Sequence, residues 1–282
     1  MALTINTNMA SLLVQKNMTA ATNSLNTSIE RMTTGYKINA AKDDAAGFFV
    51  SKTMQVQLSS TAVAEDNCAI GTSLLNTAES NYDLLTTHLQ RIRDLTEQAA
   101  NGTYGQDSID AIKSEIESRL AEIDRVAHSC EFNGIQLMDG SAGDINIQCG
   151  IDSTANSQIK LEAELFSNSE ASVLMGVSGT DFLAKFVAGG TDYASALDEV
   201  DEAIQKISKR QTKLGVYQNR LESASDALSV KYEQTTSSLS TIRDADIAEE
   251  SSAFIKAQIL QQASASLLST ANQTPSIALN LI

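Results

Sequence analysis

The feature that most constrains the fold is a regular run of apolar residues between positions 197 and 242. Positions on one helical face recur there in alternating steps of three and four residues, with Gln211, Gln218, Ser225 and Thr235 as polar exceptions. The apolar or aromatic members are Leu197, Val200, Ile204, Ile207, Leu214, Leu221, Leu228, Tyr232, Leu239 and Ile242. This heptad pattern predicts one helix, roughly 65–70 Å long, packed in coiled-coil fashion. A helix of that length needs a partner along its whole seam.

A second helical pattern, from Phe48 to Ala100, is the natural partner in the same chain. It ends at Asn101-Gly102, and a third helix is expected to begin near Asp107 or Ser108, both good N-cap residues. The chain has a single proline, Pro275, so little else interrupts long helices. The apolar faces of these two helices read Cys68, Leu75, Ala78, Tyr82, Leu85, Leu89 and Ile92, and then Ile109, Ile112, Ile116, Leu120, Ile123 and Val126.

The segment from about 139 to 190 has a different character. Apolar residues alternate with polar ones over 145–151 and again over 159–163, with a polar turn between them. Alternation with a period of two predicts a β-hairpin. The glycines at 176, 179, 189 and 190 predict irregular loops after it.

Both ends of the chain carry helical periodicity, and the last helix is expected to be interrupted at Pro275. The terminal helices have one apolar face and little else in the chain to pack on, which is typical of elements that wait for another subunit. The predicted assembly seam consists of Ile5, Met9, Leu12, Leu25, Ile29, Met32, Phe254, Ile259, Leu260, Leu267 and Leu268.

These patterns predict a mainly α fold. We expect a long antiparallel helical bundle or coiled coil with a small β-hairpin segment, and N- and C-terminal helices paired in an inner layer. The predicted domains are 1–45 with 245–282, the inner coiled coil, and 46–244, the outer helical domain.

Composition excludes several classes of function. The formal net charge is −15, with 35 acidic against 20 basic residues, which disfavours nucleic-acid binding. No run approaches the ~18 apolar residues of a membrane span, and the N-terminus lacks the features of a signal peptide. Any export would use a dedicated route without a cleaved signal.

Enzymatic chemistry is not indicated, so no catalytic residue, cofactor or metal site is predicted. His88 and His128 lie outside any metal-binding motif, and phosphate-binding and nucleophile motifs are absent from the sequence. Asp43 and Asp44 are interpreted as a helix start or as partners of nearby lysines rather than as a cation site.

Six blocks, in order, resemble bacterial flagellin over nearly the whole chain. They are MALTINTNMASLLVQKN at the N-terminus, IERMTTGYKINAAKDDAAG from Ile29, LQRIRDLTEQAANGTYG from Leu89, SEIESRLAEIDRVAHSCEFNG from Ser114, LGVYQNRLESA, and IRDADIAEESSAFIKAQILQQASASLLSTANQTP. The resemblance implies a subunit that polymerises into the flagellar filament, is secreted to the cell exterior, and lacks the variable outer domains of larger flagellins. It also implies an export chaperone and a filament cap as partners.

The resemblance further implies contacts with an animal innate immune receptor. The residues that match the family's contact positions are Arg91, Leu95 and Glu115, while Glu97 stands where many receptor-activating flagellins carry valine. The same surface packs between subunits in family filaments, and an exposed arginine is otherwise only a solvated charge.

Cysteine is unusual in this family, and the chain has three. Cys68 is expected to pack in the core. We hypothesise that Cys130 and Cys149 lie near each other and oxidise outside the cell.

Three alternatives remain open. A hook–filament junction protein shares the flagellin-like ends, but should lack the LQRIRDLTEQAANG block. An enzyme on a helical scaffold would need converging polar groups in a pocket. A membrane-active helical toxin would need the Lys/Arg-rich polar face that is missing here, and a liposome leakage assay would separate it from an assembly protein.

Overall fold

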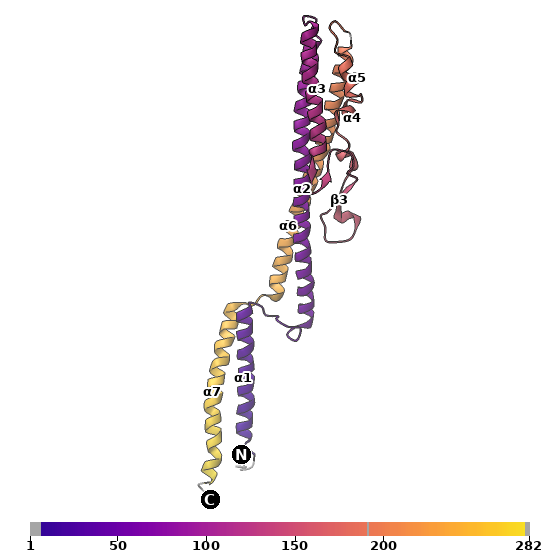
Figure 1. Cartoon of the computed structure of the whole chain (residues 1–282). Coiled ribbons are helices and arrows are strands. Elements are labelled where there is room, and N and C mark those ends of the chain that lie inside the picture. The colour runs from indigo at the N-terminus through magenta and orange to yellow at the C-terminus, as the bar shows by residue number, and fades with distance from the viewer. Residues whose placement is uncertain (1–6, 191, 280–282) are drawn as a thin grey trace. The chain divides into compact units, whose positions relative to one another are not determined.

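The structure is a computed structural model that describes residues 7–190 and 192–279 (Figure 1). The chain divides into two compact units. One, the terminal unit, comprises 1–58 and 233–282, and the other, the central unit, comprises 59–232. Two long helices, α2 (Ala45–Ala99) and α6 (Tyr193–Arg243), contribute residues to both units.

Three helices build the central unit: α2, α6 and α3 (Gln106–Ser129). The order of polar contacts shows that α2 runs antiparallel to both partners. Arg93 of α2 pairs with Asp201 and the earlier residue Glu65 with the later residue Ser229 of α6. Towards α3, Arg91 pairs with Glu115, and the earlier residue His88 with the later residue Arg119. The predicted apolar faces form the core of this unit, which confirms the long-helix bundle. Its fully buried members include Leu75, Tyr82, Leu85, Leu89, Ile92, Ile116, Ile123, Val200, Ile207, Leu214 and Leu221.

Four short strands form two antiparallel hairpins in the central unit. The predicted hairpin is present as β3 (Ile145–Gln148) paired with β4 (Gln158–Leu161). A second hairpin, β1 (Glu131–Phe132) with β2 (Ile135–Gln136), was not predicted. Its turn places Asn133 and Gly134 at positive φ, as an Asn-Gly hairpin turn requires.

The segment expected to form irregular loops contains two short helices, α4 (Ala171–Met175) and α5 (Gly179–Ala184). Both bury apolar side chains in the central core. The aromatic rings of Phe182 and Phe186 lie 5.4 Å apart, and Tyr193 meets Phe186 edge-on at 5.7 Å. The segment that contains α4 and α5 therefore completes the hydrophobic core of the central unit.

The expected cap of α3 is wrong. The helix begins one residue before Asp107, and its N-cap is Gly105, which makes no side-chain hydrogen bond. Asp107 instead lies in the first turn, where an acidic side chain interacts favourably with the helix dipole.

The terminal unit contains an antiparallel pair, α1 (Met9–Thr34) and α7 (Ile247–Leu279), which lie side by side in Figure 1. Ile5, the first residue of the predicted seam, lies outside the described residues.

The predicted interruption of α7 at Pro275 is wrong, because the helix continues to Leu279. Proline lacks the N–H that would bond the carbonyl of Ala271, four residues earlier. The side-chain amide of Asn8 replaces it and donates to that carbonyl at 2.8 Å. The same Asn8 side chain caps α1 by accepting from the Ser11 backbone N–H. The helix therefore tolerates the proline because another element satisfies the freed oxygen.

Candidate assembly surface

The contact between α1 and α7 has small side chains at most of its buried positions. Its buried members are Ala21 and Ser28 on α1, and Glu250, Ala257 and Ser264 on α7, each spaced by seven residues from the next. A seven-residue repeat is the period of a coiled-coil seam. Small residues at these positions limit the apolar area that is fully buried between the two helices. The half-buried members that fill the remaining seam positions are Ser11, Val14, Met18, Leu25, Met32, Phe254, Gln261, Leu268 and Ala271.

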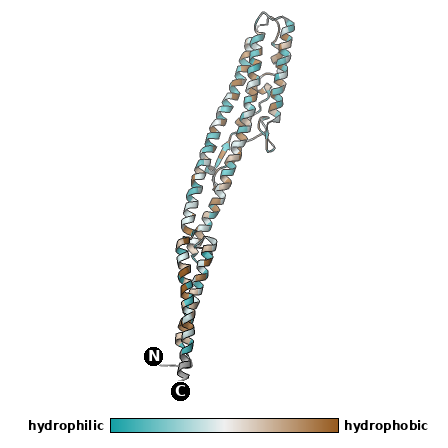
Figure 2. Ribbon diagram, turned by 90° about the vertical axis from the view of Figure 1, so that its left-hand side faces the viewer, coloured by the Kyte–Doolittle hydropathy of each residue, from teal (hydrophilic) through white to brown (hydrophobic). Residues whose placement is uncertain are grey.

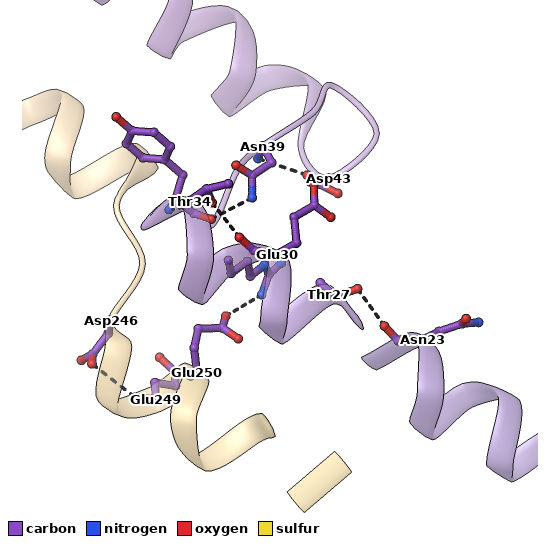
Figure 3. Close-up of polar contacts among 11 residues, drawn as sticks. Asn23, Thr27, Glu30, Thr34, Asn39, Asp43, Asp246, Glu249 and Glu250 are labelled. Carbon is purple, nitrogen blue, oxygen red and sulfur yellow. Dashed lines mark hydrogen bonds and ion pairs between the residues drawn. The ribbon is translucent and has the colours of Figure 1, made fainter. Parts of the chain in front are cut away.

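Polar contacts fix the register of the pair. Arg31 Nη1 lies 2.9 Å from Glu250 Oε1, and Figure 3 shows Glu250 reaching from its helix toward α1. Glu250 is only 9% exposed, so solvent screens this ion pair less than a surface pair. Further along, Gln261 Nε2 donates to Thr22 Oγ1 at 3.1 Å, and Ser11 Oγ donates to Asn272 Oδ1 at 2.9 Å.

Large apolar side chains lie on the outer faces of the same two helices. Met9 is 69% exposed, Ile259 59% and Leu267 58%. Figure 2 shows hydrophobic residues distributed along both helices of the pair. Scattered exposed leucines are ordinary, but a concentration on two neighbouring helices marks an interaction surface. The remaining strongly exposed members are Leu12, Leu13, Ile29, Ile247, Ile255 and Leu260.

The structure divides the predicted assembly seam into two sets. Four residues, Leu25, Met32, Phe254 and Leu268, are half-buried and lie at seam positions of the α1–α7 pair. The others with described positions lie outside that contact and are exposed: Met9, Leu12, Ile29, Ile259, Leu260 and Leu267. Apolar periodicity did not identify the small residues of the inner seam, although their seven-residue spacing is visible in the sequence.

A groove of about 630 Å³ runs along one face of the pair. Its lining consists mainly of alanine and serine side chains, flanked by Leu260 and Leu267. Both helices contribute, from Asn17 to Ser24 and from Ala253 to Leu267. Small residues allow an approaching helix to come close, so the groove suits an apolar helix edge.

The segment that follows α1 contacts the segment that precedes α7. Tyr36 forms an antiparallel bridge with Asp244, and the guanidinium of Arg243 lies 4.0 Å from the centre of the Tyr36 ring. Gly35 adopts the left-handed conformation at φ 75° that ends α1, and its carbonyl accepts from Ala245 N–H. Residues separated by about 200 positions are thereby tied together.

The two adjacent aspartates organise the loop before α2. Asp43 Oδ2 accepts the backbone N–H groups of Asn39 and Ala40, and the bond from Ala40 is the main cause that lowers the Asp43 pKa (Figure 3). Asp44 Oδ1 accepts the N–H of Ala46 at the start of α2. The interpretation as a helix start is therefore confirmed for Asp44, whereas Asp43 binds the preceding loop.

The predicted receptor-contact residues lie on neighbouring turns of α2 and α3. Arg91 Nε and Glu115 Oε1 form a surface ion pair at 3.0 Å, while Leu95 is buried in the core beneath it. His88 is near Arg119 on the same face, and burial, followed by the Arg119 charge, lowers the pKa of its imidazole. Arg91 and Glu115 are thus available at the surface of the isolated chain, and Leu95 is not.

A metal site is not found in the part of the chain that the structure describes. Over those residues, no group of three or more histidine, cysteine, aspartate or glutamate side chains is placed to hold a metal ion. Likewise, no described helix combines the length and hydropathy that crossing a bilayer requires. The geometry defines a helical structural subunit whose terminal helix pair carries an exposed apolar surface.

The family models and the sequence relatives agree with this class. A family model of the bacterial flagellin N-terminal helical region matches residues 5–143, and one of the C-terminal helical region matches 197–282. Flagellin of Bacillus subtilis is 35% identical over 99% of each chain, and the flagellar filament 33 kDa core protein of Treponema phagedenis is 31% identical over 99% of each. A crystal structure of Bacillus cereus flagellin aligns with 58% of this chain and 88% of its own, at 28% identity and a TM-score of 0.48.

The chain belongs to the bacterial flagellin family. It is a short member without a large outer domain, and it serves as a structural subunit of the flagellar filament, which is extracellular.

Proposed function

We propose that the α1–α7 pair is the element through which this subunit polymerises. The observation that carries the proposal is the distribution of side chains: the buried positions between the helices hold mainly small residues, while many large apolar residues lie exposed outside the contact. Neighbouring copies would bury those outer residues, and the groove beside Leu260 and Leu267 would receive a helix from another copy. A head-to-tail contact of this kind does not close on itself and generates a fibre.

The proposal assigns the predicted domains their roles. Residues 1–45 and 245–282 would form the inner layer of the filament, and residues 46–244 the outer layer. The buried core of the central unit supports an outer domain that folds without its neighbours, whereas the terminal pair gains most of its apolar burial on assembly.

The decisive experiment replaces one exposed apolar residue with a charge. Leu267→Glu leaves the inner seam untouched and should raise the critical concentration for polymerisation at least tenfold. Burying a leucine contributes about 1.5–3 kcal/mol, and each 1.4 kcal/mol is a factor of ten. Sedimentation and electron microscopy of the purified chain give the measurement.

Gln262→Glu is the matched control, because it adds the same charge at an exposed polar position of the same helix. It should polymerise like the unmodified chain. If Leu267→Glu forms normal filaments, this surface has no role in assembly. If both variants fail to polymerise, the added charge rather than the lost leucine is the cause.

Secretion through the flagellum's own channel, binding of an export chaperone at the C-terminal helix and growth beneath a cap are proposed from family membership. The exposed apolar face of α7 supports the chaperone step, because an unassembled subunit needs that face covered. Leu267→Glu should therefore also weaken chaperone binding, measured by isothermal titration with the chaperone from the same bacterium.

A second proposed role is recognition by an animal innate immune receptor. The Arg91–Glu115 pair supports it, since both side chains are exposed on adjacent helices at positions that match the family's contact residues. Arg91→Ala should lower signalling in receptor-expressing reporter cells by about tenfold, within the range of one interfacial arginine. Arg125→Ala, which breaks a similar exposed pair with Glu122 on α3, should leave signalling unchanged. Equal responses to both variants would contradict the role of Arg91.

A further inference from the structure

The β3–β4 hairpin is seated on α2 by consecutive residues of its first strand. Ile147 packs directly over Gly71, where an added Cβ atom would lie 2.4 Å from the Ile147 Cδ1 atom. The next residue, Gln148, accepts a hydrogen bond through its carbonyl oxygen from Asn67 Nδ2 at 3.2 Å. In α2, Asn67 immediately precedes Cys68 and Gly71 follows it by three residues. In the hairpin, Ile147 and Gln148 immediately precede Cys149. The register of this contact therefore brings the two cysteines together.

The two thiols lie close enough to affect each other's pKa: Cys149 lowers the pKa of Cys68, and Cys68 raises the pKa of Cys149. Cys68 is buried at 1% exposure in the face of α2, and Cys149 is half-buried at the end of β3. The Cys149 backbone N–H donates to the Ser157 carbonyl at 2.9 Å, which holds this residue against the facing end of the hairpin.

This arrangement favours a partner for Cys149 other than the expected Cys130. Cys130 follows α3 and is buried in the core, where burial raises the pKa of its thiol to about 11. The thiol that interacts with Cys149 is Cys68, on a different helix. All three cysteines are free thiols in the structure.

We propose that Cys68 and Cys149 are a redox pair that closes to a disulfide by exchange with a low-molecular-weight disulfide. The half-exposed Cys149 thiolate attacks one sulfur of the small disulfide, forms a mixed disulfide, and releases one small thiol. The Cys68 thiolate then attacks the Cys149 sulfur, forms the Cys68–Cys149 bond, and releases the second small thiol. The two protein thiols are oxidised by two electrons, the small disulfide is reduced to two thiols, and their protons pass to the released thiolates.

A cavity of about 260 Å³ lies beside the end of β3. It is lined by Gln148 and Gly150, the sequence neighbours of Cys149, and by Ala64 and Asn67 of α2, but by neither thiol itself. The Cys68 thiol is buried and does not meet the small disulfide directly. The more exposed Cys149 thiol therefore attacks first.

The reaction should be slow at neutral pH. Burial is the main cause that raises the pKa of both thiols, and for Cys149, which also interacts with Cys68, the value is about 12. The negative charge of Glu65 also disfavours the Cys68 thiolate, and Glu65 itself accepts from Ser229 Oγ. Because the thiolate is the nucleophile, exchange should accelerate about tenfold per pH unit from 7 to 9.

The test uses the full-length chain, equilibrated with excess oxidised glutathione at pH 8.5, then acid-quenched and alkylated for peptide mass spectrometry. We expect a linked peptide pair containing Cys68 and Cys149, with Cys130 as the one remaining free thiol of the three. Cys130→Ser, the matched control, should form the same link. Cys68→Ser should instead trap the mixed disulfide of glutathione at Cys149.

A thermal measurement provides a second readout. Oxidation should raise the midpoint of thermal unfolding of the unmodified chain and of Cys130→Ser, reversibly on reduction, and leave Cys149→Ser unchanged. A Cys130–Cys149 link, or a stable mixed disulfide at Cys149 while Cys68 is present and free, would overturn the proposal.

Discussion

Asn8 serves two helices through different atoms of one side-chain amide. Its oxygen caps α1, and its nitrogen satisfies the Ala271 carbonyl that Pro275 leaves without a helical donor. The sequence predicted the consequence of a proline in isolation, a broken helix. The partner that prevents the break lies 263 positions away, so no local pattern could reveal it.

Asn8→Asp separates these two roles, because a carboxylate keeps the cap acceptor and loses the donor. We expect amide hydrogen exchange in the last turns of α7 to accelerate about fivefold, as for the loss of ~1 kcal/mol from one hydrogen bond. Hydrogen-exchange mass spectrometry of assembled filaments measures it. Pro275→Ala restores the missing N–H, so Asn8→Asp should have little effect in that background. An equal effect in both backgrounds would contradict the compensation.

Cys130 gives a residue-scale prediction about pH. Its folded-state pKa of about 11 exceeds the ordinary value of 9.0, because burial favours the neutral thiol. Because the pKa is higher in the folded state, the neutral Cys130 thiol contributes its full stabilisation below pH 9. That stabilisation is lost as the pH rises toward 11. Relative to Cys130→Ala, the free energy of unfolding of the unmodified chain should fall more steeply over this window, by about 1.4 kcal/mol per pH unit. Urea titrations followed by circular dichroism test it, and parallel pH profiles would contradict it.

At the scale of elements, long periodic segments were predictable and short ones were not. The heptads predicted α2, α3 and α6, because each seam repeats over many turns and the central core buries it. The β1–β2 hairpin, α4 and α5 contain two to six residues each, too few to display a period. Tertiary packing against the bundle orders them.

The candidate site was predictable in part for a related reason. Apolar spacing identified the terminal helices, but it could not tell which apolar residues face the partner helix within the chain. That division depends on small residues such as Ala21 and Ala257, which carry weak hydropathy signals. Apolar periodicity alone therefore merged the inner seam and the outer surface.

Two helical glycines should respond in opposite ways to alanine. Gly215 in α6 has open space around an added Cβ atom, so Gly215→Ala should raise the free energy of unfolding by about 0.5–1 kcal/mol. Gly71→Ala meets Ile147, and overpacking should leave it about 1–3 kcal/mol less stable than Gly215→Ala. Urea denaturation of both variants supplies the comparison. Equal stabilisation would show that the hairpin does not rest closely on α2.

At the scale of the whole molecule, the two units differ in what holds them together. The central unit contains the buried core, whereas the α1–α7 contact combines small side chains at most of its buried positions with half-buried apolar residues and a few polar pairs. A fragment of residues 46–244 should therefore unfold cooperatively by circular dichroism, and should remain monomeric in sedimentation at concentrations where the full chain forms filaments. Filaments from this fragment would place the polymerisation element elsewhere.

The small-residue seam between α1 and α7 has a kinetic consequence. A free subunit gains little from pairing its own terminal helices, and two free subunits gain little more, because each offers an equally unsupported surface. An existing filament end presents several such surfaces already held in place. Growth by addition to ends should then be favourable where spontaneous initiation is rare, so solutions of the pure subunit should show a long lag that preformed fragments abolish.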